Sequence, residues 1–190
     1  FDNFMLDLLS LGDIKKEVTI EDFAGIIDRI AIRKTKDFEI LGVIAYVYNF
    51  SGERSIKIKL DSSYYVYQVD RGFLQEGTEI TDKMTYSPVL LLYSLFKEKQ
   101  KSPEIRVGNK IVRQGENIQL DFPIQKENRI FRVRILSGEK EIYQKIITSD
   151  IKHLSIPVAY NEQIGNYTVE VTDVLTGLKN QEIINIQSTK

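Results

Sequence analysis

The sequence predicts an all-β protein of two tandem β-sandwich domains, preceded by a short N-terminal helix. Three observations favour this fold class. Apolar β-branched and aromatic residues alternate with polar residues along most of the chain, turns rich in Gly, Asn and Pro recur, and a polar, charged segment divides the 190 residues into two similar lengths. We place the domains at 1–101 and 102–190, each long enough to bury a core of its own.

The first domain begins with a helical pattern and then changes to strands. Between Phe1 and Leu11 the apolar residues recur at helical spacing, so we expect one short helix that ends near Gly12. The nearly continuous β-branched and aromatic run at 38–50 predicts a strand buried on both faces. Residues 54–61 alternate between apolar and charged side chains, which predicts a strand with one face in water.

The remainder of the first domain is expected to contain further strands separated by turns. Residues 64–69 continue the strand pattern, the segment 70–72 supplies a turn, and a second turn is expected at Gly77. The apolar run 87–96 fits a helix or a strand by composition, and Pro88 favours a strand because proline suits a strand's first residue. The polar segment KEKQKSPEI that follows is typical of a linker.

The second domain shows the pattern of an immunoglobulin-like or fibronectin type III-like sandwich. Short strands separated by Gly, Asn and Pro turns over about ninety residues are typical of that architecture. The clearest hairpin turns at Ser137 and Gly138, with Val133 and Ile135 facing inward. The strands are expected at 104–107, 111–112, 117–122, 130–136, 141–148, 153–156, 166–174 and 182–186.

The stretch VAYNEQIGNYTVEVTDVLTG, residues 158–177, predicts the last hairpin of this sandwich. A glycine two residues before Tyr167, followed by alternating valines, is typical of the penultimate strand, where the tyrosine hydroxyl bonds to backbone across the corner. We expect Gly177 to adopt a positive φ in the turn before the last strand. The polar residues between the valines are expected on the opposite, wetter face: Thr168, Glu170 and Thr172.

Most of the chain is covered by three segments with turn and strand chemistry in common with a known family. They are IKIKLDSSYYVYQVDRGFLQEGTEI, RQGENIQLDFPI and IPVAYNEQIGNYTVEVTDVLTGL. Together they resemble the non-catalytic C-terminal portion of large bacterial β-galactosidase-like and other glycoside-hydrolase-like proteins. The resemblance implies one closing β-sandwich followed by an immunoglobulin-like module. The family's catalytic carboxylates lie in an upstream barrel that no segment here matches, so none is carried over.

Few residues of the sequence are candidates for catalysis or metal binding. His153 is the single histidine and cysteine is absent, which excludes a multi-histidine metal site, a thiol nucleophile and a disulfide scaffold within this chain. We therefore expect no metal site and no cofactor. The acidic pair Glu21 and Asp22, together with Asp70 and Glu76, are candidates for catalysis by residue type alone, so we expect no enzyme activity from this chain.

Tyr65 and Tyr67 are the best candidates for ligand binding. Alternate residues of a strand share one face, and sugars stack on flat aromatic rings. The competing interpretation is that both rings pack within the domain. The first interpretation predicts a carbohydrate-binding face, whereas the second leaves the domain without a ligand site.

Charge and hydropathy limit the partners. The chain has 26 Lys and Arg residues against 27 Asp and Glu without a basic segment, so nucleic acid is not expected, and no apolar run is long enough for membrane insertion. Because the sequence starts without Met or a signal-like segment, we interpret it as part of a longer chain.

The function expected from the resemblance is that of an accessory or structural module in a secreted or cell-envelope bacterial glycan-processing protein. Its partners would be an upstream domain of the same chain, or a second copy in a homo-oligomer. A carbohydrate-binding module, with a glycan as partner, is the first alternative. A surface-layer or adhesion repeat unrelated to glycan enzymes is the other.

Overall fold

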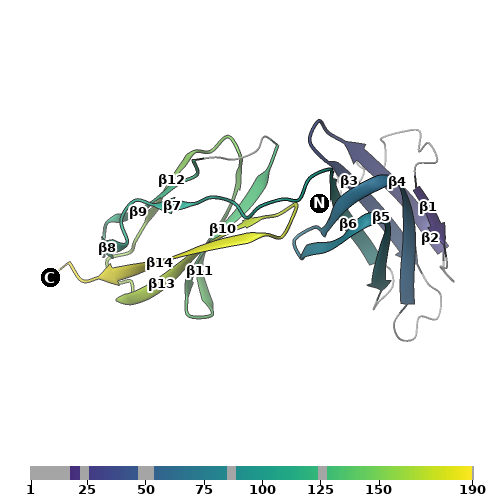
Figure 1. Cartoon of the computed structure of the whole chain (residues 1–190). Helices are drawn as coiled ribbons and strands as arrows, with labels where there is room; N and C mark the ends of the chain where they lie inside the picture. Colours follow the sequence, from purple (N-terminus) through teal and green to yellow (C-terminus); the bar gives the residue numbers. More distant parts are fainter. Residues whose placement is uncertain (1–17, 22–25, 47–53, 85–88, 124–127, 190) are drawn as a thin grey trace. The chain divides into compact units, whose positions relative to one another are not determined.

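The computed structural model describes residues 18–21, 26–46, 54–84, 89–123 and 128–189, and every regular element in these ranges is a β-strand (Figure 1). The chain is therefore all-β within the described residues. It divides into two compact units, an N-terminal unit at 1–100 and a C-terminal unit at 101–190. The helix expected between Phe1 and Leu11 lies outside the described residues.

The N-terminal unit is built on one antiparallel six-stranded sheet with the order β1-β4-β6-β3-β2, and β5 pairs with β4 outside this path. β4 is long because it spans the two stretches with strand patterns around residues 54–61 and 64–68. The strands are β1 Val18–Glu21, β2 Ile26–Lys34, β3 Glu39–Tyr46, β4 Arg54–Gln68, β5 Gly72–Met84 and β6 Val89–Phe96.

The long strand β4 belongs to both halves of this sheet. Its first half pairs with β1 and its last residues pair with β6, while β5 follows it along most of its length. The inner sides of both halves contribute to one core, with Ile56 and Ile58 from the first half and Val66 from the second. The sheet therefore curves around a single apolar core, which burial of these side chains stabilises.

The turn expected at Gly77 is absent, because β5 continues through this residue. Gly77 has a φ of 145° and pairs with Tyr64, next to a register shift between Lys59 and Tyr64. A glycine in such a conformation accommodates an irregularity in the ladder without ending the strand. The expectation was wrong because the pairing partner, which decides between a bulge and a turn, is not visible locally.

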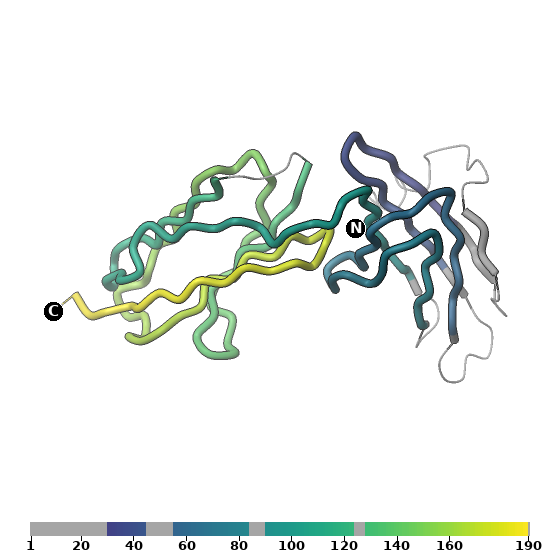
Figure 2. The backbone as a smooth tube through the Cα atoms, viewed as in Figure 1, coloured from purple at the N-terminus to yellow at the C-terminus, as the bar shows by residue number. Residues whose placement is uncertain are grey.

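The C-terminal unit has a five-stranded sheet, β11-β10-β13-β14-β8, and a three-stranded sheet, β12-β9-β7. The backbone passes repeatedly from one sheet to the other (Figure 2). One core collects buried side chains from both sheets, so the arrangement is β-sandwich-like. The strands are β7 Arg106–Val107, β8 Ile111–Arg113, β9 Asn117–Asp121, β10 Ile130–Ser137, β11 Lys140–Thr148, β12 His153–Pro157, β13 Gly165–Asp173 and β14 Lys179–Gln187.

The hairpin expected around Gly138 is confirmed. β10 and β11 pair antiparallel, and Val133 and Ile135 are buried in the core as the alternation predicts. Gly138 has a φ of 59°, which favours glycine in this tight turn. The register shifts next to Ile135, so the hairpin contains one bulge near its turn.

Candidate functional site

Tyr67, one of the two tyrosines expected to bind a ligand, is buried within the N-terminal unit. Its side chain is 1% exposed, and its hydroxyl accepts a hydrogen bond of 2.8 Å from the backbone N–H of Gln100. The ring packs edge-on against Phe73 and Phe96, with centroids 5.4 Å and 5.7 Å away. A sugar could stack on this ring only if that packing opened.

Tyr65 lies two residues earlier on β4 and is partly exposed. Glu76 is the residue directly opposite on β5, and its negative charge raises the tyrosine pKa. The structure therefore places the two tyrosines in different environments. The glycan-binding face stays a prediction, and of the two rings only that of Tyr65 is accessible to a ligand.

Among the described residues, the candidate carboxylates Asp70 and Glu76 occupy separate places on the β4–β5 hairpin. Asp70 lies in the turn between β4 and β5 with a φ of 65°, and Glu76 is the partner of Tyr65. Glu21 pairs in register with Lys57 at the end of β1, and Asp22 is outside the described residues. Asp70 and Glu76 therefore serve a turn and a cross-strand contact.

A cluster that the sequence did not indicate lies inside the N-terminal unit. The buried Tyr93 hydroxyl donates to Asp82 Oδ2 at 2.8 Å, and Gln68 Nε2 donates to the same oxygen at 3.2 Å. Burial raises the pKa of the Tyr93 hydroxyl above its ordinary value, and the Asp82 carboxylate adds to the rise. These contacts join β5 to the last residues of β4 and to β6, so they stabilise the curvature of the sheet.

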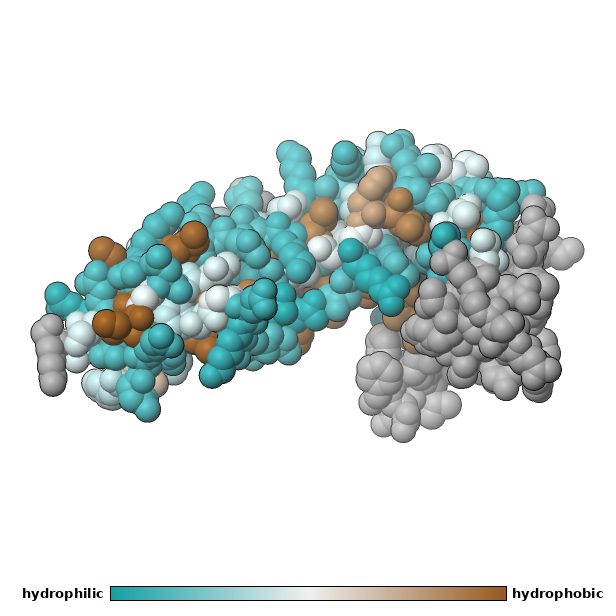
Figure 3. Space-filling model, turned by 90° about the horizontal axis from the view of Figure 1, so that it is seen from below, coloured by the Kyte–Doolittle hydropathy of each residue, from teal (hydrophilic) through white to brown (hydrophobic). Residues whose placement is uncertain are grey.

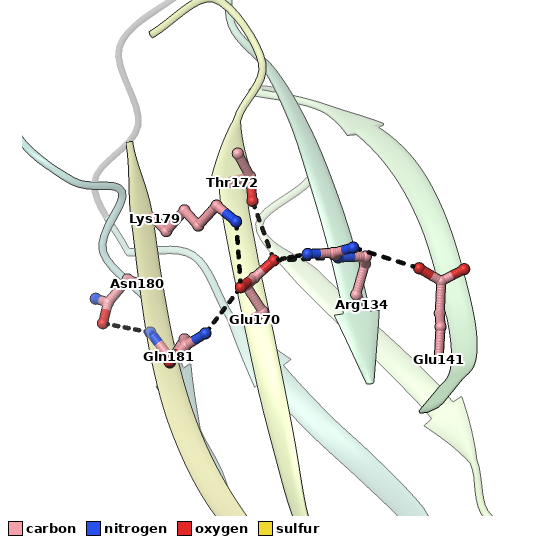
Figure 4. Close-up of polar contacts among 7 residues, drawn as sticks. All are labelled: Arg134, Glu141, Glu170, Thr172, Lys179, Asn180 and Gln181. Carbon is pink, nitrogen blue, oxygen red and sulfur yellow. Dashed lines mark hydrogen bonds and ion pairs between the residues drawn. The ribbon is translucent and has the colours of Figure 1, made fainter. Parts of the chain in front are cut away.

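The richest polar cluster surrounds Glu170 on the outer face of the five-stranded sheet (Figure 4). Arg134 Nε donates to Glu170 Oε1 at 3.1 Å, and Arg134 Nη2 contacts the same oxygen. Gln181 Nε2 donates to Glu170 Oε2 at 2.8 Å, and Lys179 Nζ lies 3.6 Å from that oxygen. Arg134 Nη1 is also 3.6 Å from Glu141 Oε2, so the cluster links β11, β10, β13 and β14.

The burial of Glu170 and Thr172 contradicts the expected wetter face, whereas Thr168 is half-buried. Glu170 is 3% exposed and Thr172 is 0% exposed, because long side chains on the neighbouring strands cover them. Burial by itself raises the pKa of Glu170, but hydrogen bonds from Arg134 and Gln181 and the nearby positive charges lower it below its ordinary value. The carboxylate is therefore held in its charged form, which suits a structural contact better than proton transfer.

A second buried ion pair anchors the last hairpin. Arg129 Nη1 donates to Asp173 Oδ2 at 2.8 Å, and both side chains are less than a tenth exposed. The other carboxylate oxygen accepts the backbone N–H of Leu175 at 3.0 Å. Gly177 has a φ of 65° and donates its N–H to the Asp173 carbonyl at 2.7 Å, which confirms the conformation expected for this glycine.

The tyrosine motif of the same hairpin is confirmed as well. Tyr167 is 2% exposed, and its hydroxyl donates a hydrogen bond of 2.6 Å to the backbone carbonyl of Gln163, four residues upstream. The carboxylate of Glu162 lies 2.9 Å from that hydroxyl. This bond fixes the corner where the chain enters β13.

His153 lies on the outer side of the three-stranded sheet. Its Nδ1 is 2.6 Å from Asp121 Oδ1, and the pairing register places Arg106 on the other side of Asp121. The His153 side chain is 81% exposed, so this contact is open to solvent and contributes little stability. An open depression in this region is lined by Arg106, Asp121, Phe122, Pro123, Lys152 and His153.

Within the described ranges, no group of three or more His, Cys, Asp or Glu residues is arranged to hold a metal ion. In the same part of the chain, no helix is long and apolar enough to span a membrane. No protein-family model matches the sequence, and no curated protein matches it significantly.

Proposed function

We propose that this chain is a non-catalytic structural module of a larger secreted or cell-envelope bacterial protein that processes glycans. Its N-terminal unit acts as a domain whose one six-stranded sheet curves around its own core, and its C-terminal unit acts as an immunoglobulin-like or fibronectin type III-like β-sandwich. They serve as spacer, as packing partner for an upstream domain, or as an oligomer contact. The parallel pairing of β8 with β14 and the distribution of strands over a five-stranded and a three-stranded sheet support the second assignment.

One observation carries the proposal. In the segment that resembles the accessory modules, the conspicuous polar side chains are engaged in contacts within the C-terminal unit. Tyr167 bonds to the backbone of its own corner, Glu170 joins neighbouring strands, and Asp173 holds the turn of the hairpin. Their chemistry is therefore used to maintain the fold, which is what a spacer or packing domain requires.

The test is to assay the purified chain with a panel of fluorogenic glycosides and on a glycan array. We expect no turnover and no binding from protein that unfolds cooperatively. Reproducible turnover that disappears on Asp70→Asn or Glu76→Gln would overturn the proposal, because the assigned role leaves these carboxylates without a reaction to catalyse.

A carbohydrate-binding module is the second candidate, and the position of Tyr65 favours it. The ring is partly exposed, and the adjacent Glu76 carboxylate could accept hydrogen bonds from sugar hydroxyls. This candidate predicts binding on the array that is lost in Tyr65→Ala. Tyr160→Ala is the matched control because that side chain is 80% exposed and lies in the other unit, so its loss should leave binding unchanged.

A further inference from the structure

The C-terminal unit carries one long open sheet edge. Among the described strands, β11 pairs only with β10, and it is nine residues long. The other outermost strands of this unit are shorter, with three residues in β8, five in β12 and two in β7. Because soluble proteins usually keep open edges short, β11 is the edge of this unit best suited to pair with another chain.

The hydrogen-bond pattern shows which backbone groups of β11 face outward. The N–H of Ser149 donates a hydrogen bond of 3.0 Å to the carbonyl of Arg129, so these opposite residues form a hydrogen-bonded pair. Bonded and non-bonded pairs alternate along an antiparallel ladder, and the register continues without a shift as far as Tyr143. The backbone groups directed away from β10 are therefore those of Gln144, Ile146 and Thr148.

Two of the exposed side chains along this edge are isoleucines, between polar and charged residues. Ile146 is 54% exposed and Ile142 is 36% exposed. Apolar residues stand out as separate brown areas on a largely hydrophilic surface in Figure 3. A pairing that covers both isoleucines would remove apolar surface from water and satisfy outward backbone groups at the same time.

We propose that β11 pairs antiparallel with β11 of a second copy of this chain, about a two-fold axis at Gln144. This inference rests on the oligomer contact included in the proposed function. The register places Ile142, the extra residue of the β10–β11 bulge, opposite Ile146 of the second copy, and the reverse, on both sides of the axis. It also places Tyr143 opposite Lys145 of the second copy, where an ammonium group can lie against an aromatic ring.

Neighbouring registers are less favourable. An axis at Lys145 would place two lysines opposite each other, and like charges in direct opposition destabilise a strand pair. An axis at Tyr143 would place each Ile142 opposite Gln144 and leave Ile146 opposite Lys140. Of these three registers, the axis at Gln144 is the one that places both isoleucines opposite an isoleucine. Such a two-fold contact uses the same residues from both copies and closes on itself.

Cysteine crosslinking tests the register directly, because the chain has no cysteine of its own. In the paired strands, residues 144 of the two copies are opposite, with Cα atoms about 5.5 Å apart, which is within the range that a disulfide spans. We expect Gln144→Cys to form a covalent dimer under mild oxidation. The control is Lys140→Cys, whose counterpart would be about 27 Å away at roughly 3.4 Å per residue, so it should form no disulfide-linked dimer.

Sedimentation equilibrium of the full chain tests the contact without crosslinks. We expect a dimer that Ile146→Lys weakens at least tenfold, while Ile183→Lys leaves it intact. Ile183 is the matched control because it is 61% exposed on the outer face of the same sheet but away from the edge. A thermal unfolding transition near that of the unmodified chain confirms that each variant is folded.

Three outcomes would overturn the edge pairing. These are a chain that is monomeric throughout the concentration series, a dimer lost in Ile183→Lys but kept in Ile146→Lys, and equal crosslinking of the two cysteine variants. A monomer without glycosidase turnover would reject the pairing and leave the proposed structural role in place. Glycoside turnover would reject the proposed role, whatever the oligomeric state.

Discussion

Asp173→Ala tests the most completely buried ion pair of the C-terminal unit. The substitution removes the carboxylate that Arg129 Nη1 contacts at 2.8 Å, and with it the acceptor for the N–H of Leu175. Burial raises the pKa of Asp173, while the Arg129 charge and the donors around the carboxylate oppose the rise. Burying the two charges costs desolvation free energy, which their mutual attraction offsets. When one partner is removed, the other stays buried without this compensation.

The magnitude follows from the burial of the partner that remains. The Arg129 side chain is 3% exposed, so its guanidinium cannot regain water without local unfolding. Removing one member of a buried ion pair costs about 3–5 kcal/mol. In a domain of 60–100 residues, 1 kcal/mol shifts the midpoint of thermal unfolding by about 4–8 °C, so the expected loss is at least about 12 °C.

Differential scanning calorimetry combined with hydrogen exchange measures this loss and locates it. We expect the transition of the C-terminal unit to move and the amides of β13 to lose protection, while amides of the N-terminal unit keep theirs. Asp150→Ala is the matched control, because Asp150 is exposed and surface substitutions usually stay within about 0.5 kcal/mol. The double variant Arg129→Met with Asp173→Asn should recover most of the stability, since the amide can still accept the N–H of Leu175.

The reasoning fails if Asp173→Ala costs less than about 1 kcal/mol, a value typical of an exposed ion pair. It also fails if the double variant is as unstable as the single one. In that case an unpaired buried charge on Arg129 would not be the source of the loss, because the double variant carries no such charge and keeps an acceptor for the N–H of Leu175.

Three further predictions concern the same unit. The pKa of Glu170 is lower in the folded state than in the unfolded state. Its contribution to stability is therefore complete above the unfolded-state pKa and is lost as the pH falls through the folded-state pKa. Glu170→Gln should make the free energy of unfolding, measured by urea titration, fall less steeply between neutral and acidic pH. Tyr167→Phe removes the bond to Gln163 and should cost about 0.5–1.5 kcal/mol in the same titration at neutral pH. Gly138→Ala at a φ of 59° should cost about 1 kcal/mol by the same measurement, although its side chain would meet no atom within 4 Å.

Local signals were sufficient for the hairpin around Gly138 and for the motifs of the last hairpin. The alternation around Val133 and Ile135 predicts their burial, and the glycine two residues before Tyr167 predicts the corner and its backbone bond. Gly177 follows the same logic, because turn chemistry is decided by a few consecutive residues. These predictions succeed because each depends on a pattern within one strand or one turn.

Features that depend on which strands pair were not accessible in this way. Glu170 was expected in water because it alternates with buried valines, yet Arg134 from β10 and Gln181 from β14 cover it. The Arg129–Asp173 pair joins residues 44 positions apart. Tyr67 is partly enclosed by Phe96, whose position follows from the pairing of β4 with β6. A pattern in one strand carries no information about its neighbours.

The buried charges help to select the register between strands, which apolar alternation alone does not determine. A slip of one residue between β10 and β13 would reverse the faces of the strand and is excluded by the core. A slip of two residues keeps every valine on the core side, so hydrophobic burial alone discriminates poorly against it. In the observed register Arg134, Glu170 and Gln181 lie in one row across three strands. A slip of two residues would separate the carboxylate from its donors while leaving it buried, so this row selects the register among arrangements that the core would accept.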